Sequence, residues 1–322
     1  MKKFRFSVLL LVLALLIASV SVVLAQDTLG ASQDDYNLWT TANANFATVN
    51  TLTYNFTATL NVTGMSDPTD NVSANLTGSG VLDKTDMQNP SFQLDVTGSA
   101  TQGGTSTPVT AGVRITGGNV YFTSDGTNWQ GEALSDISSS MSSMFGQGFG
   151  AATGSAEATP PSLSSISSNP EAMQMMQALS QIKPSDFLTL TRADNNGLAD
   201  FTLNIDIAKL LSSPAFTSAM NTAMSSASSE GAASTDVAQA QQYLGMAQML
   251  FSTAKITLDQ YVDPSSQLVQ RTVLDVNVPL DSLMGPGAGV KANFDISLSN
   301  YNQPVTVQVP ANVTMTSGSS SG

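Results

Sequence analysis

The chain offers few side chains that could carry out chemistry. Its 322 residues include no histidine and no cysteine, which removes the usual general base, the thiolate nucleophile and most zinc ligands. Carboxylates remain, and a pair such as Asp83 and Asp86 in "LDKTD" could in principle cleave a glycosidic bond. Acids in such a turn are more commonly solvated, because Asp stabilises turns through bonds to nearby backbone. We therefore predict a non-catalytic protein with no catalytic residues and no cofactor.

Two acidic turns could supply oxygen ligands to calcium. They read "DNNGLAD" (194–200) and "SDPTDN" (66–71). Neither matches the twelve-residue calcium loop that ends in glutamate. In addition, Asn196-Gly197 lies between two strand-like runs and is explained as a hairpin turn. We predict no metal site, and calcium at these turns stays the open alternative.

The charge and the N-terminus indicate where the protein acts. A formal charge of −13 disfavours nucleic acid, whose phosphates need Lys and Arg, and docking on an anionic membrane by charge alone. A basic start, an apolar run over 8–24 and Ala25 predict a signal peptide at 1–25. The run is close to the ~18 residues that span a bilayer, so an uncleaved N-terminal anchor is the alternative. We expect an exported, extracellular or cell-envelope protein whose membrane contact is through this segment or transient.

Hydrophobic periodicity predicts the elements of the mature chain. Ser32 can cap a helix that carries Tyr36, Trp39, Phe46 and Val49 on one face. The period then changes to two, which is typical of half-buried strands. The expected strands lie at 51–64, 71–83, 90–100, 107–118, 119–131, 186–211 (a hairpin), 254–263, 268–280, 290–302 and 304–310. Further helices are expected near 169–182, 214–227 and 236–253.

This order of elements defines the fold class and the domain plan. Strands come in runs rather than alternating with helices, which favours α+β with one large antiparallel sheet and helices on one face. Neither half has an obviously complete core, so we predict a single domain over 26–315. A Ser/Gly/Met-rich stretch at about 135–168 reads as a flexible insertion, and 316–322 as a disordered tail.

Several stretches together resemble the LolA-like superfamily, and most closely its branch of LppX and LprG lipoproteins and related exported bacterial proteins. They are "TLTYNFTATL" (51–60), "VRITGGNVYFTSDGTNW" (113–129), "LDQYVDPSSQLVQRTVLDV" (258–276) and "SNYNQPVTVQVP" (299–310). The resemblance implies a curved half-barrel of about 11 strands wrapped around helices, with acyl chains held between them. The chain departs from that branch in having no cysteine for lipid modification and in the insertion at 135–168.

Candidate ligand-binding residues follow from the helices and from the resemblance. As cavity-lining candidates we take Trp39, Phe46, Met175, Met176, Leu179, Tyr243, Met246, Met249 and Leu250. Methionine adapts to variable apolar shapes, although apolar stripes at helical spacing usually fill an ordinary core. Trp129 could cap the mouth of a cavity or simply close the end of the sheet.

The function expected from this reading is that of an exported carrier for a lipid or another acylated hydrophobic ligand, with a cell-envelope protein as a second possible partner. The alternative is a cell-surface structural or partner-binding module with a filled core. A continuous apolar cavity would distinguish the two.

Overall fold

The computed structural model describes residues 28–65, 67–86, 89–135, 183–218, 242, 245, 248, 249 and 251–316. The signal peptide expected at 1–25, nearly all of the insertion expected at 135–168, the helix expected at 169–182 and the tail at 317–322 lie outside these residues. So does most of the helical region expected over 214–227 and 236–253.

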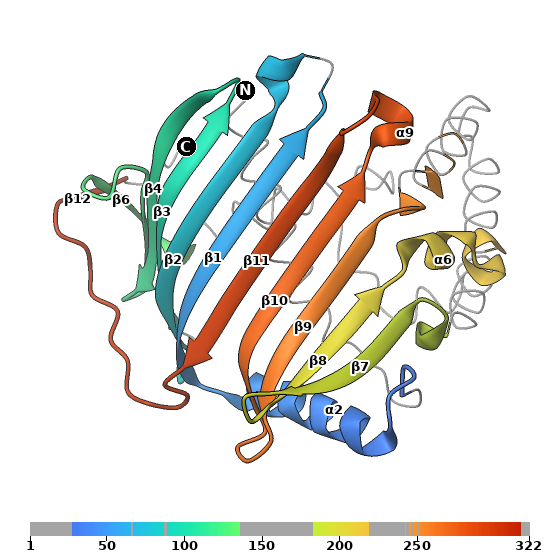
Figure 1. The fold of residues 1–322 in the computed structure, drawn as a ribbon. Helices are drawn as coiled ribbons and strands as arrows, with labels where there is room; N and C mark the ends of the chain where they lie inside the picture. Colours follow the sequence, from blue (N-terminus) through green and yellow to red (C-terminus); the bar gives the residue numbers. More distant parts are fainter. Residues whose placement is uncertain are drawn as a thin grey trace, which may run out of the picture.

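One sheet of 12 strands dominates the described part of the chain (Figure 1). Its order is β12-β6-β5-β4-β3-β2-β1-β11-β10-β9-β8-β7, and every neighbouring pair is antiparallel except β12 and β6, which are parallel. The strands are β1 (Thr51–Thr63), β2 (Val72–Asp83), β3 (Ser91–Gln102), β4 (Thr105–Thr116), β5 (Asn119–Thr123), β6 (Trp129–Ala133), β7 (Leu188–Asn195), β8 (Leu198–Ile205), β9 (Lys255–Asp263), β10 (Leu268–Pro279), β11 (Gly289–Ser299) and β12 (Val313–Met315).

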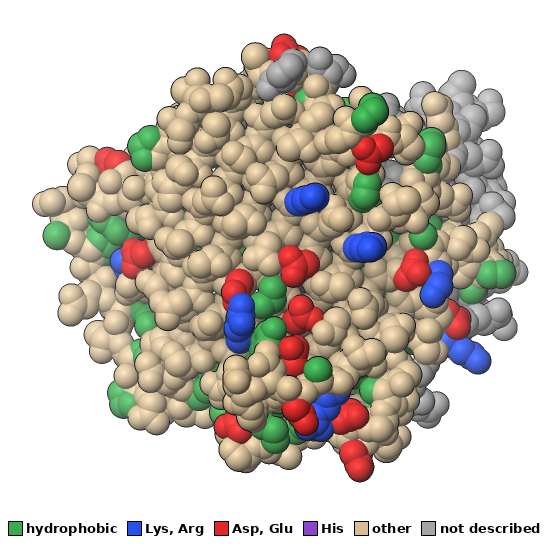
Figure 2. All heavy atoms as spheres, in the orientation of Figure 1, with side chains coloured by type: hydrophobic (Ala, Val, Ile, Leu, Met, Phe, Trp, Pro, Cys, Tyr) green, Lys and Arg blue, Asp and Glu red, His purple; other side chains and the backbone are tan. Residues whose placement is uncertain are grey.

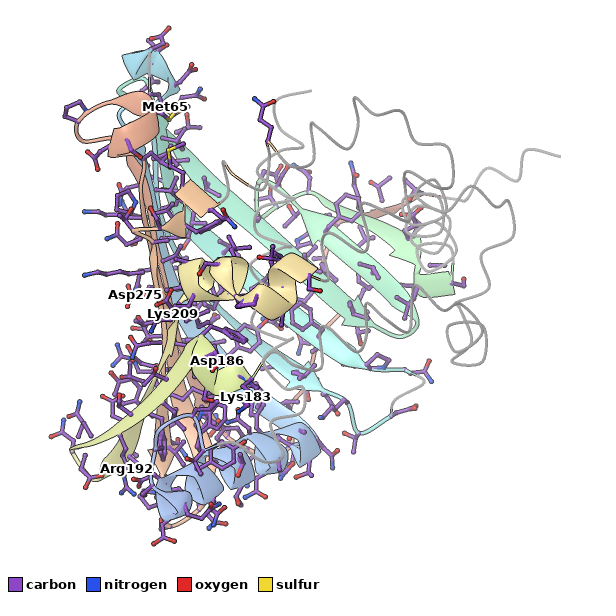
Figure 3. The ribbon with its side chains drawn as sticks, turned by 90° about the vertical axis from the view of Figure 1, so that its right-hand side faces the viewer. Met65, Lys183, Asp186, Arg192, Lys209 and Asp275 are labelled. Atoms are coloured by element: carbon purple, nitrogen blue, oxygen red, sulfur yellow. The ribbon has the colours of Figure 1, made fainter. Side chains whose placement is uncertain are left out.

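The sheet is curved, and its described helices of more than one turn lie on the inner side. Seen along its edge, the half with β3 and β4 swings away from the plane of β7–β11 (Figure 3). Helix α2 (Gln33–Thr48) and the short α6 (Ile207–Ser212) lie on the side toward which the sheet bends. The predicted α+β class with a curved antiparallel sheet is confirmed, with 12 strands where about 11 were expected.

The predicted cap of the first helix is present. The backbone N–H of Asp35 donates to Ser32 Oγ at 3.2 Å, which satisfies one of the free donors of the first turn. Tyr36 and Trp39 are buried against the sheet, whereas Phe46 is 36% exposed. The indole N–H of Trp39 donates to Gln260 Oε1 on β9 at 2.6 Å and ties the helix to the sheet.

Period-two alternation explains which side chains face inward. On β1, Leu52, Tyr54 and Phe56 point to the inner face, while Thr53 and Asn55 point outward. Tyr54 lies across Gly80 and donates its hydroxyl to the carbonyl of Gln93 at 2.6 Å. A Cβ at Gly80 would stand 2.0 Å from that carbonyl and 2.4 Å from the Tyr54 hydroxyl, so only glycine fits there.

The hairpin predicted around 195–197 is confirmed, but the end of that run is not a strand. Asn196 and Gly197 both have positive φ, 50° and 82°, as a two-residue turn of this kind requires. The chain then forms α6 instead of extending to residue 211, because Asp206 caps a helix by accepting from Lys209 N–H at 2.9 Å.

The prediction of a strand at 304–310 was wrong, because these residues pair with no strand. Both neighbours of β11 are occupied, by β1 and β10, so the chain has to leave the sheet when β11 ends. It turns at Asn300 and Asn302, both with positive φ, and runs without strand pairing to the far edge, where β12 pairs with β6. Pro304 and Pro310 lack the N–H that a ladder needs.

Candidate functional site

The inner face of the sheet carries rows of apolar side chains across most of the described strands. Across β1–β4 and β8–β11 its inward positions carry no charged side chain. The outer face differs, since Figure 2 shows few hydrophobic side chains there and a group of acidic and basic ones. On β10 and β11, Arg271 and Asp295 form an ion pair at 2.6 Å. The two faces are therefore suited to different partners.

The inner face has two zones, and the first is packed as a core beneath α2. Trp39 is 4% exposed, and Phe201 and Val262 are fully buried. The buried members of this cluster are Leu29, Tyr36, Trp39, Ala42, Val49, Leu52, Tyr54, Leu190, Ala199, Phe201, Leu203, Leu258, Val262, Val269, Leu274 and Leu298. This zone packs the helix onto the sheet.

The second zone continues the same apolar rows toward the other end of the strands. Its members on β1–β4 and β11 are partly accessible to solvent and lie outside the core cluster. They are Ala58, Leu60, Val62, Val72, Val96, Ala100, Val109, Val290 and Ala292. We call this set the upper inner face. A half-buried surface of this composition can contact acyl chains by dispersion and burial, without fixed polar contacts.

An aromatic band lies between the two zones. Phe56 and Phe294 stack with ring centroids 5.3 Å apart, and Tyr54 and Phe92 stack at 6.2 Å. Burial raises the pKa of the Tyr54 phenol far above its usual value, since the ionised form would lose its hydration. The band is therefore neutral at physiological pH and adds rigid apolar area to the lower border of the upper inner face.

Three of the nine candidate residues lie within the described chain. Trp39 belongs to the packed core and is held by Gln260. Phe46 lies near the end of α2 with 36% of its surface exposed, and Met249 is 46% exposed. The other six lie outside the described residues: Met175, Met176, Leu179, Tyr243, Met246 and Leu250. Contact of any of the nine with a ligand stays a prediction.

Sequence reasoning did not select the residues of the upper inner face as site candidates. The alternation of "TLTYNFTATLNVTG" placed Leu60 on the inward side of a strand. Alternation does not say which part of that side a helix covers, because α2 packs on strands more than 200 residues away in the sequence. The signal was present on each strand, but the division into two zones depends on tertiary packing.

Trp129 does not face this surface. It is 8% exposed on the outer side of the sheet, with the Arg114 guanidinium 4.9 Å from its ring centroid. A Cβ at Gly112 would stand 2.6 Å from the indole, so Trp129 packs directly on the backbone of β4. Trp129 therefore does not cover the core of the inner face, and it lines a space on the outer side of the sheet instead.

Acidic and amide side chains of the two turns make local hydrogen bonds to the backbone and one local ion pair. Asp67 accepts from the Thr69 N–H at 2.9 Å, and Asn71 accepts from the Met65 N–H at 3.1 Å. Asp194 pairs with Arg192 at 2.9 Å. Within the residues that the structure describes, no cluster of three or more acidic side chains could hold a metal ion, and no helix has the length and apolarity to cross a membrane.

Comparison with known proteins leaves the family of this chain undetermined. No family model matches it, and no curated protein matches its sequence. Among solved structures it is similar to "LprF from Mycobacterium bovis", with 13% identity, a TM-score of 0.32, and 87% of this chain and 98% of that chain covered. A likeness this distant carries no argument about function, so the function is argued from the geometry.

Proposed function

We propose that this protein is an exported, non-catalytic binding protein that holds a lipid or another hydrophobic ligand against the upper inner face. The observation that carries the proposal is the continuation of uncharged apolar rows beyond the core under α2, with side chains that are only half-buried. Monomeric proteins rarely leave large contiguous apolar surfaces accessible unless these bind something. Affinity would come from burial of about 0.8 kcal/mol per CH₂ of the ligand.

The difference in polarity between the two faces of the sheet supports a ligand site on the inner face. The outer face is polar, so the sheet can stay in water while its inner face contacts an apolar guest. The aromatic band provides a firm lower boundary, because Phe56 and Phe294 are stacked and Tyr54 is fixed by its hydrogen bond to Gln93. A single domain, export, and the non-enzymatic role remain part of this proposal.

The first test is native mass spectrometry of the secreted protein, followed by solvent extraction and lipid analysis. A lipid bound near one-to-one is the expected result. A bare mass that stays unchanged after incubation with phospholipid vesicles would contradict the proposal and favour the structural or partner-binding module with a filled core.

A matched pair of variants locates the ligand. Leu60→Asp places a charge on the upper inner face, and we expect lipid occupancy to fall at least about tenfold, since a charge among acyl chains has no compensating partner. Asn61→Asp is the control, because Asn61 is the next residue, exposed, and opposite Lys291 on β11. Equal occupancy in both variants, with both folded by circular dichroism, would place the ligand elsewhere.

A further inference from the structure

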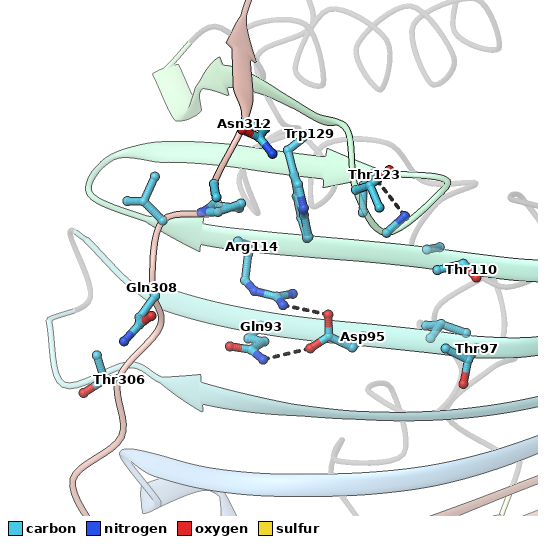
Figure 4. A pocket seen from close by; sticks show the side chains of 17 residues that line it. Gln93, Asp95, Thr97, Thr110, Arg114, Thr123, Trp129, Thr306, Gln308 and Asn312 are labelled. Carbon is cyan, nitrogen blue, oxygen red and sulfur yellow. Dashed lines mark hydrogen bonds and ion pairs between the residues drawn. The ribbon is translucent and has the colours of Figure 1, made fainter.

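A pocket lies on the outer face, away from the proposed lipid site. The segment 306–312, which we call the outer segment, stands off from β3 and β4 and borders an open space of about 700 Å³ (Figure 4). Its floor is made by outward-facing side chains of the two strands, among them Gln93, Asp95 and Arg114. Trp129 and the turn at 126–127 form one wall, and the segment forms the other. The volume is within the usual range for ligand pockets.

The outer segment is fixed at both ends, so the pocket is a built feature. Near its start, Val307 is 9% exposed and its carbonyl accepts from Thr116 Oγ1 at 3.4 Å. At its far end, β12 pairs with β6, and the Thr316 N–H donates to the Gly131 carbonyl at 2.9 Å. Residues 308–311 span the distance between these attachments. The same arrangement buries Tyr121 and Trp129.

The charges within the pocket neutralise one another. Arg114 Nη2 is 2.6 Å from Asp95 Oδ1. Arg114 Nη1 also donates to the carbonyls of Leu94 and Val113, at 3.1 and 3.0 Å. With the guanidinium also lying over Trp129, Arg114 has little capacity left for an anion. Asp95 and Arg114 are the charged residues among those that line the pocket.

The remaining lining groups are uncharged and polar. Gln93 Nε2 donates to Asp95 Oδ2 at 2.8 Å, which fixes the amide with its oxygen available as an acceptor. Gln308 and Asn312 add two further amides, and threonines add hydroxyls from both strands and the outer segment. An amide presents a donor and an acceptor side by side, and a hydroxyl does both. Groups of these kinds can bond to hydroxyls, which both donate and accept hydrogen bonds.

We propose that this outer pocket binds a neutral saccharide segment, through its amides and hydroxyls and with Val309 and the edge of Trp129 against the sugar's C–H faces. An anionic ligand would meet a neutral pocket on a chain of net charge −13. A purely apolar ligand would leave the amides without partners. The site lies on the face opposite the upper inner face, so the inference does not rest on the proposed lipid function.

The test is isothermal titration of the whole secreted protein with short neutral gluco-, manno- and galacto-oligosaccharides, and with oligogalacturonate as the acidic counterpart. We expect at least one neutral saccharide to bind saturably. Binding of none, or of the acidic one alone, overturns the proposal.

Variants then place the binding in the pocket. Gln308→Ala should weaken it about tenfold, the equivalent of one lost hydrogen bond of about 1.4 kcal/mol. Gln303→Ala is the control, since Gln303 is an exposed glutamine on the same C-terminal stretch and does not line the pocket. Equal affinity in the two variants overturns the assignment.

Vesicles that carry a neutral glycolipid separate the two sources of sugar. Binding to the free oligosaccharide that Gln308→Ala weakens supports a polysaccharide ligand at the outer pocket. Binding to the vesicles alone, lost in Leu60→Asp and retained in Gln308→Ala, shows that the sugar is carried on a lipid at the inner face and overturns the outer site.

Discussion

The hydrogen-bonded link between α2 and the sheet gives the sharpest prediction about stability. Gln260 is 9% exposed on β9. Its Oε1 accepts from the Trp39 indole at 2.6 Å and from Asn43 Nδ2 at 3.2 Å, and its Nε2 donates to Asn43 Oδ1 at 3.2 Å. Gln260→Leu keeps the side-chain volume roughly constant and removes all three bonds.

The expected cost comes mainly from the indole N–H. A buried donor left without a partner costs about 1–3 kcal/mol. Asn43 also donates to the carbonyl of Trp39 at 2.8 Å and is only part-buried, so its loss is smaller. We expect Gln260→Leu to lower the free energy of unfolding by about 2–3 kcal/mol, which for a chain of this size lowers Tm by roughly 3–5 °C.

Urea unfolding followed by circular dichroism and tryptophan fluorescence measures this change. Gln303→Leu, an exposed glutamine, is the control and should change the free energy of unfolding by less than about 0.5 kcal/mol. In a Trp39→Phe background, Gln260→Leu should cost about 1–2 kcal/mol less, because no indole donor remains to be left unpaired. A loss below about 0.5 kcal/mol in the native background, or strict additivity in the double variant, would refute the reasoning.

Three further predictions follow from local geometry. Gly80→Ala should destabilise the fold by about 1–3 kcal/mol or prevent folding, since the new Cβ overlaps a backbone carbonyl; unchanged urea midpoints would contradict this. Burial raises the pKa of both Tyr54 and Tyr301, so the folded state keeps protons that the unfolded state releases. Stability should then be full below about pH 10 and fall above it, and a Tyr54→Phe, Tyr301→Phe variant should show a flatter decline from pH 9 to 11.5. Ser32→Ala should lower the free energy of unfolding by about 1 kcal/mol through the lost cap. It should also raise the pKa of Asp35, which hydrogen bonds from Ser32 and Arg192 hold below its usual value. An NMR titration that shows no change in that pKa would count against the contact between Ser32 and Asp35.

Features that depend on neighbouring residues, such as helix caps and the two faces of a strand, could be predicted from the sequence. Ser32 caps the first helix as expected, and alternation correctly assigned the two faces of β1. The segment at 304–310 shows the limit of such local patterns. Its sequence "PVTVQVP" alternates like a strand, but both edges of the preceding strand β11 are already paired, so no free edge is available beside it. Alternation indicates an extended backbone, whereas pairing depends on which edges the rest of the chain leaves free.

Contacts between distant residues were outside the reach of sequence patterns. Trp39 and Gln260 are 221 positions apart, and nothing local to either residue indicates the other. Arg114 and Asp95 could pair only once β3 and β4 had been placed in register. The outer pocket could not be predicted either, because one of its walls is the segment 306–312, and most of that segment had been predicted to be a strand of the sheet.

The pairing of β1 with β11 has a consequence for how the chain reaches its folded state. Hairpins connect the strands from β1 to β6, β7 to β8, and the strands from β9 to β11, whereas the long stretch 206–254 joins β8 to β9. The meander β1–β6 and the group β7–β11 meet along a single seam, whose partners Thr53 and Ser299 are 246 positions apart. Local hairpins close quickly, whereas a loop of this length closes late and slowly. We expect closure of the seam to be the rate-limiting event in folding. Until the seam closes, the unpaired edge of β1 and the uncovered apolar side of each group of strands are open to aggregation. Chains that are still folding should therefore depend on a chaperone or on rapid dilution for their yield.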